Sequence, residues 1–374
     1  MAKTAIIQVS TPEEKTFESV EDLVAYLRLI EQDSQWEECS SDCITFSENP
    51  NGVPFAGFGG DEFECVCFSP NIGLTNYPLR YTALQSILAR AECYGNGIKR
   101  LFLSDKAKFA EHLNDYFSLK DGRQAKMKAL LQDGKLSALH SGSYTPIPME
   151  KVFLAVNDFV EDFEETKFTR ASWTWEKTES LYRISDSSIT DTYTKLVGKY
   201  MPVFNKNLQI ELLAISSDVA EAAVRFYPRY IVDGHEIPIS GGAAVKHIGK
   251  VTIETVENRL YNVFASFEAS CRNLAGLGDI ELNNKKNVMI KAFTILNVPQ
   301  KYGAEIVERY DNTKTTALEV YTSMCEVLRL MRGKLDKFSV LNYEDNLSRL
   351  ITWNRSTWKR IDISGVVAWS AKGK

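Results

Sequence analysis

The sequence is poor in the features that mark common protein classes. It has four histidines among 374 residues, and no apolar run approaches the roughly 20 residues that a membrane-spanning helix needs. The first residues, MAKTAIIQVSTPEEKTF, contain a short apolar stretch but no secretory core and no small-residue cleavage site. We therefore expect no membrane association and a cytoplasmic location.

Sequence signatures of catalysis and of nucleotide binding are also missing. No H-E-x-x-H, G-x-S-x-G, Walker or dinucleotide-binding pattern occurs in the chain. The stretch GFGG at 57–60 does not have the spacing of a phosphate-binding loop, and no helix pattern follows it directly. We therefore expect no cofactor and favour a non-catalytic protein over an enzyme.

Cysteine is the one metal-binding residue type with a suggestive spacing. The chain has seven cysteines, an odd number, which favours reduced thiols over a disulfide framework. A C-x3-C and a C-x-C pair lie about twenty residues apart. Two residues of a C-x-C pair on an extended strand point to opposite faces, so buried thiols are the preferred interpretation and zinc is the alternative. The four candidate ligands are Cys39, Cys43, Cys65 and Cys67.

Charge is distributed unevenly along a chain of ordinary composition, with 44% hydrophobic and 25% charged residues. Residues 1–80 contain fourteen acids and four bases, whereas the chain from Arg329 onward contains ten bases and four acids. An acidic front and a basic end predict either a site for a polyanion or two surfaces that attract one another.

Hydrophobic periodicity predicts an α+β protein with two lobes, an acidic N-terminal lobe at 1–145 and a larger lobe at 146–374. Helical spacing occurs at 19–32, 105–117 and 317–331, and we also expect a helix at 81–97 capped by Gly95 and one at 122–134. The stretch 168–185 alternates as a half-buried strand does, and the basic, aromatic C-terminal segment adds a possible edge strand.

The densest region, 208–275, predicts an antiparallel sheet followed by a long helix at 253–275. Asp233-Gly234 predicts a type I′ hairpin turn, and Gly241-Gly242 predicts a second one. Pro228 and Pro238 lack the N–H that a ladder needs, so their strands are expected at edges or bulges.

A sheet followed by a long helix is a geometry that single-strand annealing proteins use, with a basic groove between hairpin and helix. We therefore predict binding of single-stranded DNA or RNA in such a groove, with tail aromatics stacking on bases and tail cations meeting phosphates. The predicted groove residues are Lys246, His247, Lys250 and Arg259, and the tail residues are Trp353, Trp358, Lys359 and Arg360.

A resemblance agrees with this reading over roughly residues 150–374. The stretch 208–250 and the long helix after it resemble the uncharacterised phage- and plasmid-borne proteins of the YfjQ/YafZ type. The shared positions are Ser217, Asp218, His247 and Gly249, while Val232-Asp233-Gly234 stands where that family has Cys-x-Asn-Gly. The resemblance implies a mobile-element origin, a bacterial host cell and no established activity.

Two other functions remain open at this stage. A counter-defence protein that binds and inhibits a host factor would use aromatic anchors, for which Phe55, Phe58 and Phe63 are the candidates. A hydrolase would use His235 and His247, although His235 and Glu236 are neighbours that point apart on a strand. In each case we expect a homo-oligomer.

Overall fold

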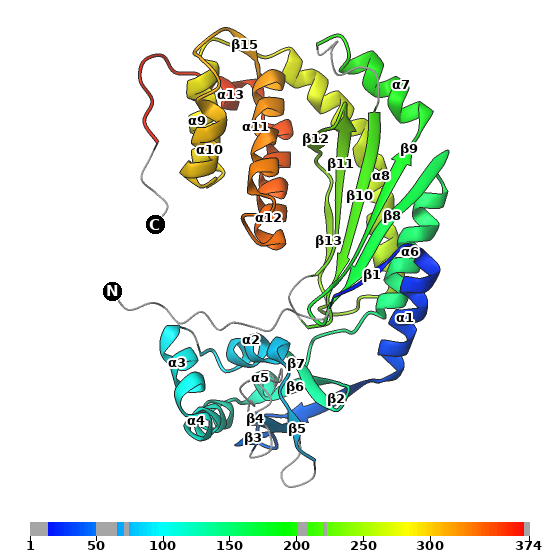
Figure 1. The fold of residues 1–374 in the computed structure, drawn as a ribbon, viewed down its shortest axis with the longest axis vertical. Coiled ribbons are helices and arrows are strands. Elements are labelled where there is room, and N and C mark those ends of the chain that lie inside the picture. Colours follow the sequence, from blue (N-terminus) through cyan, green and yellow to red (C-terminus); the bar gives the residue numbers. More distant parts are fainter. Residues whose placement is uncertain are drawn as a thin grey trace.

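The computed structural model describes residues 14–49, 66–70, 75–93, 95–200, 208–219 and 223–369. It has the α+β class predicted from the sequence, with antiparallel sheets packed against helices. The outline resembles a letter C, in which a small lobe forms one end, a group of helices forms the other, and a large sheet lies between them (Figure 1). None of the helices in the described ranges is long and apolar enough to cross a membrane.

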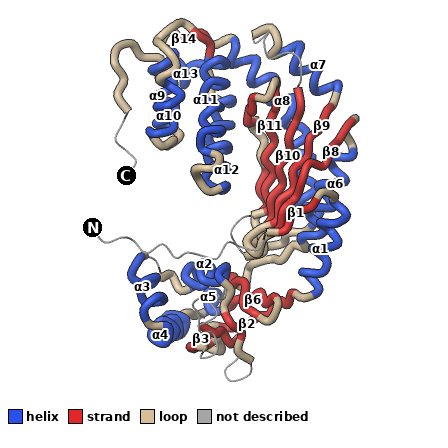
Figure 2. The backbone as a smooth tube through the Cα atoms, viewed as in Figure 1, coloured by secondary structure: helices blue, strands red, loops and turns tan. Residues whose placement is uncertain are grey.

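The large sheet has seven strands within the described residues, all paired antiparallel (Figure 2). Their order is β1-β8-β9-β10-β11-β12, and β13 also pairs with β11. The strands are β1 (Lys15–Phe17), β8 (Glu165–Trp173), β9 (Thr178–Ser185), β10 (Leu208–Ser216), β11 (Val224–Val232), β12 (His235–Pro238) and β13 (Ala243–Val245). The alternating stretch 168–185 is thus a hairpin rather than one strand, because Thr174 and Lys177 close a turn by mutual backbone hydrogen bonds.

One of the two predicted turns is confirmed and the other is wrong. Asp233 and Gly234 have φ angles of 49° and 80°, as a type I′ turn requires, and they join β11 to β12. Gly241-Gly242 makes no hairpin, because β12 and β13 both pair with β11. Pro238 lies opposite Arg229 and Ala243 lies opposite Phe226. Between these two pairs the edge strand has two more residues than β11, which makes a bulge.

One face of the large sheet is covered by four helices and forms the main core. Its side chains, such as Tyr182, Leu212 and Phe226, are almost completely buried. The covering helices are α1 (Val20–Gln32), α6 (Met149–Glu161), α7 (Ser187–Leu196) and α8 (Ile253–Gly278) (Figure 1). The Tyr230 hydroxyl donates to the Phe267 carbonyl at 2.7 Å, which attaches the sheet to the middle of α8.

The long helix confirms its predicted apolar stripe with one exception. Its buried residues include Val256, Leu260, Val263 and Phe267. Phe264, predicted on the same face, is 50% exposed because it lies at the flank of the stripe, where it contacts Phe163.

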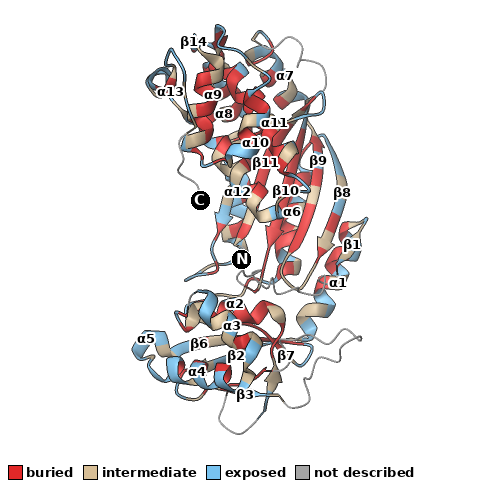
Figure 3. Ribbon diagram, turned by 60° about the vertical axis from the view of Figure 1, so that its left-hand side comes forward, coloured by how far each residue is buried: buried red, intermediate tan, exposed pale blue. Residues whose placement is uncertain are grey.

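The C-terminal helices stand beyond the sheet edge and over its second face (Figures 1 and 3). Helix α11 packs against α8 and β12, and α12 places Leu341 on Leu213, Ile215 and Tyr227 of the sheet. The elements are β14 (Glu281–Leu282), α9 (Lys285–Ile295), α10 (Gln300–Val307), β15 (Thr315–Thr316), α11 (Ala317–Met331), α12 (Lys337–Ser348), the 3₁₀ helix η3 (Arg349–Thr352) and α13 (Arg355–Ile361). The predicted C-terminal edge strand is wrong for the described residues, since 355–361 is helical and no strand follows to 369.

The small lobe has its own hydrophobic core and two three-stranded sheets. Its strands are β2 (Ser34–Ser40), β6 (Lys126–Gln132) and β7 (Lys135–Ser141) in one sheet, and β3 (Thr45–Glu48), β4 (Val66–Ser69) and β5 (Tyr77–Pro78) in the other. Its helices are α2 (Tyr81–Arg90), α3 (Asn96–Ser104), α4 (Lys106–Ser118) and α5 (Gly122–Ala125). The predicted lobe 1–145 also includes β1 and α1, which pair with β8 and pack into the core of the large lobe.

Two local predictions in the small lobe are wrong. The expected helix at 122–134 is a single turn followed by β6. This strand pairs with β2 on one side and β7 on the other, and its Met127, Ala129 and Leu131 side chains are buried. Pairing on both sides outweighs the weak helical preference of this stretch. Gly95 does not cap α2, which ends at Arg90, but precedes α3 with a φ angle of 108°.

Candidate functional site

The second face of the large sheet carries charges where the first carries apolar side chains. The strand register places Arg183, Glu211 and Arg229 directly opposite one another on β9, β10 and β11. Arg183 Nε donates to Glu211 Oε1 at 3.1 Å, and Arg229 Nε lies 3.4 Å from Glu211 Oε2. Residues that are paired across strands share a face. The result is a row of alternating charge across the middle of the sheet.

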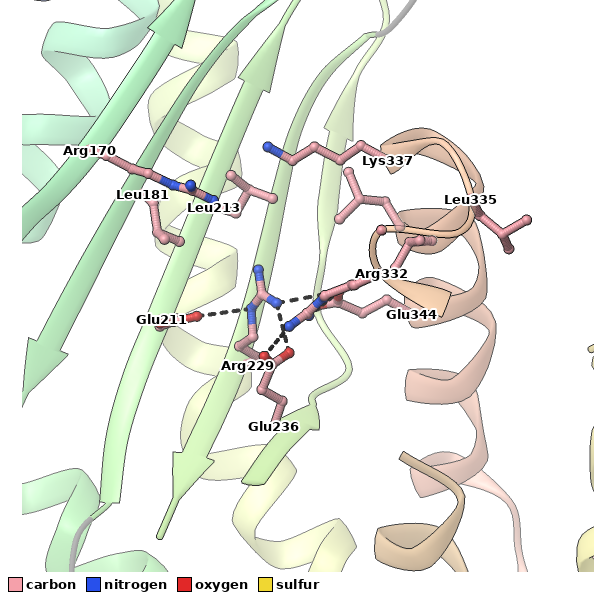
Figure 4. Close-up of a pocket in the computed structure, with 13 residues that line it drawn as sticks. Arg170, Leu181, Glu211, Leu213, Arg229, Glu236, Arg332, Leu335, Lys337 and Glu344 are labelled. Carbon is pink, nitrogen blue, oxygen red and sulfur yellow. Dashed lines mark hydrogen bonds and ion pairs between the residues drawn. The ribbon is translucent and has the colours of Figure 1, made fainter. Parts of the chain in front are cut away.

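Arg229 is the centre of this network and is almost completely buried. Its guanidinium lies 3.1 Å from Glu236 and 3.6 Å from Glu344 in addition to Glu211. Burial opposes the charged form, but the carboxylates outweigh it and raise the pKa of Arg229. Arg332, just past α11, pairs with Glu236 and lies 3.8 Å from Glu344, so two arginines share these two glutamates (Figure 4).

Glu344 is the least satisfied member of the network. Its side chain is 3% exposed, and neither carboxylate oxygen has a hydrogen-bond partner among the described residues. Burial raises its pKa, against the lowering effect of Arg229 and Arg332. Unsatisfied acceptors at this depth can receive a hydrogen bond from a ligand.

These residues line a cavity of about 420 Å³ between the sheet and the start of α12, which we call the sheet-face cleft. Figure 4 shows its charged groups converging from both sides. The floor and walls are apolar in part, from Leu181, Leu213, Leu335, Val340 and Leu341. The charged lining residues are Arg170, Arg229, Arg332 and Lys337 against Glu211, Glu236 and Glu344, so four cations and three carboxylates give a formal charge of +1.

The charges differ in depth as well as in number. Arg332 and Lys337 are 36% and 41% exposed, whereas the side chains of Glu211 and Glu344 are 9% and 3% exposed. Arg170, on β8, is exposed and forms no ion pair with the part of the chain that the structure describes. Glu236 is intermediate at 29% and Arg229 is buried at 7%, so a ligand that enters the cleft meets three exposed cations and one partly exposed carboxylate.

The cleft continues into a smaller cavity of about 90 Å³ that shares Arg170 and Lys337 with it. Glu179 lies there with two ammonium groups, 2.8 Å from Lys177 Nζ and in contact with Lys337. Burial, together with the neighbouring Lys177 and Arg170, lowers the pKa of Lys337 to about 8. The two cavities adjoin, and the smaller one adds the carboxylates of Glu14 and Glu179 beside the shared Arg170 and Lys337.

The predicted groove residues lie elsewhere, around the beginning of α8. Lys246, Lys250 and Arg259 are exposed, as a binding surface requires. His247 is 6% exposed, and its ring stacks on that of Tyr144 at 5.1 Å between centroids. The His247 side chain is therefore not accessible to a nucleic-acid strand in the predicted groove, although the three cations are.

The predicted tail residues are at the opposite end of that helix. Arg355 donates to the carbonyl of Asp279, the residue that follows α8. Because α8 has 26 residues, the tail and the groove are separated by about 39 Å along its axis. Trp358 is completely buried and packs on Trp353, so it belongs to the core and cannot stack on bases. Lys359 and Arg360 are exposed.

The two histidines of the predicted hydrolase do not meet. His235 lies opposite Val232 and Val245 lies opposite Val224, eight positions away along β11. That distance is roughly 26 Å at strand spacing, and His247 is two residues further. His235 lines a separate cavity with Lys285 and Glu319, while its neighbour Glu236 lines the sheet-face cleft, which confirms that the two side chains point apart.

The remaining candidates concern the small lobe. Phe55, Phe58, Phe63 and Cys65 lie outside the described residues. Cys39 is on β2 and Cys67 is buried on β4, and within the described ranges no group of three or more potential ligands is placed to hold a metal ion. Burial raises the pKa of Cys39 to about 12, with a smaller effect of Glu37, which keeps this thiol protonated.

Sequence reasoning missed the sheet-face cleft, although a signal for it was present. Glu211 and Arg229 interrupt two of the most apolar strands, LQIELLAIS and VRFYPRYIV. A charge inside such a strand indicates a buried partner, because an unpaired charge there is costly. Glu211 and Arg229 pair with each other across the strands, but Glu344 of α12, which also pairs with Arg229, lies more than a hundred positions later in the chain, which no local pattern reveals.

Comparisons with protein families, with curated proteins and with solved structures found no match to this chain.

Proposed function

We propose that this protein binds single-stranded nucleic acid, with phosphates on the cations of the sheet-face cleft and an unpaired base on its apolar floor. The ligand is the one expected from the sequence, but its principal contact is the second face of the sheet rather than the side of α8. It describes a binding protein without a catalytic step.

The observation that carries the proposal is the order of charge with depth. Three cations lie at the entrance, Arg170 from β8 and Arg332 and Lys337 from the other wall, while two of the three carboxylates, Glu211 and Glu344, lie beneath them and Glu236 is partly exposed. Guanidinium and ammonium groups are the usual phosphate ligands of nucleic-acid-binding proteins. Glu236 and Glu344 hold Arg332 in place, and Glu179 pairs with Lys337. Arg170 forms no ion pair within the described residues and is open to a phosphate.

The apolar floor favours a single strand over a duplex. Leu181 and Leu213 face the cavity, with Leu341 on the opposite wall. A base must be unpaired to contact such a surface, since pairing hides it inside the duplex. Glu344, at the same depth, lies in ion-pair range of Arg229 and Arg332 but accepts no hydrogen bond from the described residues, so it is suited to accept one from the amino group of an unpaired cytosine or adenine.

The test is fluorescence anisotropy with a labelled oligonucleotide of about 20 residues at about 50 mM salt. Three phosphate contacts give an expected salt slope of about 2. The double variant Arg170→Glu/Lys337→Glu should bind at least about tenfold more weakly and lose roughly two thirds of that slope. A duplex of the same sequence should bind more weakly than the strand.

Lys250→Glu/Arg259→Glu is the matched control, because it makes the same charge change in the groove predicted from the sequence. Its affinity should stay within about twofold of the unmodified protein. Loss of binding in this control alone would place the site beside α8 and reject the cleft. No binding of any oligonucleotide at about 50 mM salt would reject the function itself.

The wider expectations belong to this proposal: a mobile-element origin, action in the cytoplasm of a bacterial host, and a homo-oligomer. The rival function, inhibition of a host protein, is an outcome of a pull-down from host lysate. One stoichiometric protein that resists nuclease treatment would favour the rival, and nuclease-sensitive material would favour nucleic acid. The aromatic anchors that the rival would use lie outside the described residues.

A further inference from the structure

A second pocket lies where the small lobe meets the large one, and we call it the junction pocket. Its volume is about 230 Å³, and it does not overlap the sheet-face cleft. Arg90, at the end of α2, and His140, on β7, come from the small lobe. Tyr144 lies on the link between the lobes, and Lys246 and His247 come from the large lobe.

Three rings are stacked against this pocket. The rings of His140 and Tyr144 are 3.8 Å apart at an interplanar angle of 17°, and those of Tyr144 and His247 are 5.1 Å apart and parallel within 1°. The stack is held by the backbone, since Thr145 N–H donates to the His247 carbonyl at 2.9 Å. Stacking uses the faces of the rings and leaves their edges, which carry the polar atoms, for other partners.

Only one of the three rings has a hydrogen-bond partner at its polar edge among the described residues. His140 Nε2 donates to the Asp218 carbonyl at 2.7 Å. In contrast, both ring nitrogens of His247 and the hydroxyl of Tyr144 are buried without a hydrogen-bond partner among the described residues. A buried polar group without a partner destabilises the folded state, so such groups in a pocket point to a ligand.

The charges around the pocket indicate that the ligand is an anion. Neither the Arg90 side chain nor the Lys246 side chain forms an ion pair or hydrogen bond within the described part of the chain. The nearby Asp218 does not cancel them fully, because burial, with a smaller effect of Glu31, raises its pKa to about 7. The lining of the pocket therefore contributes two cations, and Tyr144 and His247 contribute one neutral donor each that lacks a partner within the described residues.

We infer that the junction pocket binds a phosphomonoester, held by Arg90 and Lys246 and hydrogen-bonded by His247 and Tyr144. A terminal phosphate has three free oxygens and about two negative charges, which match two cations and two donors better than the single charge of an internal phosphodiester. The volume accommodates a phosphate with an attached sugar. This site rests on different residues from the cleft, and so it does not depend on the proposed function.

A ligand in this position would join the two lobes, because Arg90 belongs to one and Lys246 to the other. Binding of a ligand to the folded state alone raises its stability by mass action. Phosphate-bearing ligands should therefore raise the melting temperature and slow proteolytic cleavage near residues 141–145, between β7 and Tyr144.

The source of the phosphate is distinguished by the choice of probes. Thermal shift and isothermal titration would compare a nucleoside 5′-monophosphate, the matching nucleoside, and a short oligonucleotide with a 5′-phosphate or a 5′-hydroxyl. Either phosphate-bearing probe should bind at least about tenfold more tightly than its partner without phosphate. Preference for the monophosphate identifies a free nucleotide as the ligand, and preference for the oligonucleotide identifies a strand end.

Arg90→Gln and Lys246→Gln test the site without disturbing the buried stack, and each should weaken binding of the phosphate-bearing probe by at least about tenfold. Arg100→Gln, an exposed cation on α3 of the same lobe, should change it less than about twofold. Equal binding of probes with and without phosphate, or unchanged binding in both junction variants, overturns the inference.

The cleft variant Arg170→Glu/Lys337→Glu should leave phosphomonoester binding intact. A circular oligonucleotide, which has no end, should still bind in the cleft. Absence of phosphomonoester binding in the junction pocket and absence of strand binding in the cleft are therefore seen in different measurements.

Discussion

The two faces of the large sheet are made from alternating residues of the same strands, yet their chemistry is opposite. On β10, Ile210 and Leu212 point into the main core, and Glu211 between them points to the network around Arg229. The first face is stabilised by burial of apolar surface, which is favourable wherever it occurs. The second face carries buried ions at positions where apolar side chains of the same size would make the folded protein at least as stable.

This contrast between the two faces points to the charged face as the functional one. A buried network of Arg229 with three glutamates contributes little net stability compared with apolar packing, because desolvation offsets most of the attraction. Its members also line a cavity and leave both oxygens of Glu344 without hydrogen bonds among the described residues. We interpret the apolar face as the part that stabilises the fold and the charged face as the part that binds.

The largest expected effect comes from breaking the charged face at its centre. Arg229→Met removes the cation that Glu211, Glu236 and Glu344 share, and leaves buried carboxylates with less compensation. We expect a loss of about 3 to 5 kcal/mol in the free energy of unfolding, measured by urea denaturation. Arg183→Met is the control, since its side chain is 50% exposed and its loss should cost about 1 kcal/mol or less.

Replacing the network as a unit separates its two roles. Arg229→Met/Glu211→Leu/Glu344→Leu removes the charges together, so its stability should return to within about 1 to 2 kcal/mol of the unmodified protein. Arg170, Arg332 and Lys337 remain, so a single strand should still bind through its phosphates, but the preference for cytosine and adenine that Glu344 provides should be lost. A triple variant that is stable and keeps this base preference would contradict the assignment of Glu344 to base contact.

A smaller effect is expected from neighbouring leucines that point to opposite faces. Leu212→Ala removes a side chain with no exposure from the main core and should cost about 3 to 4 kcal/mol. Leu213→Ala empties part of the small cluster with Leu341 and should cost about 1 to 2 kcal/mol, because the adjoining cavity is already open. Only Leu213→Ala should weaken oligonucleotide binding. Equal losses of stability would mean that the two faces are packed alike.

The sequence predicts much of the apolar face and little of the charged one. The stripe of α8, the strands of 208–232 and the turn at Asp233-Gly234 follow from local periodicity and backbone preference, and all three are confirmed. The bulge at Gly241-Gly242 was missed because a glycine pair fits both structures, and only the pairing of β12 and β13 with one strand decides between them.

The candidate site depends on contacts between residues that are far apart in the chain. Lys337 and Arg170 face the same cavity although 167 residues separate them, and no pattern in either segment predicts that meeting. Trp358 shows the opposite error. A tryptophan beside Lys359 and Arg360 suggested base stacking, but the helical turn of α13 directs the ring into the core and the cations outward. Composition indicated the residue types, and the fold decided their roles.

The smallest expected effect is a dependence of binding on pH that belongs to the charged face. The pKa of Lys337 is lowered to about 8 by burial and by Lys177 and Arg170, and a bound phosphate would raise it again. Binding then takes up a proton above about pH 8, so affinity should be constant below that value and fall above it. The fall should be about tenfold by about pH 9, because each pH unit above the free pKa changes the binding constant by at most tenfold.

Lys337→Arg keeps the charge throughout this range, since an arginine pKa exceeds about 12, and it should give a flat profile from about pH 7 to about pH 9. An oligonucleotide of cytosines and adenines is suitable as the ligand because its bases do not lose protons there. The other ionisable groups around Lys337 are Glu179 and Glu14, together with Lys177 and Arg170. If the variant and the unmodified protein lost affinity in parallel, the titrating group would be another residue, and Lys337 would not contact the bound strand.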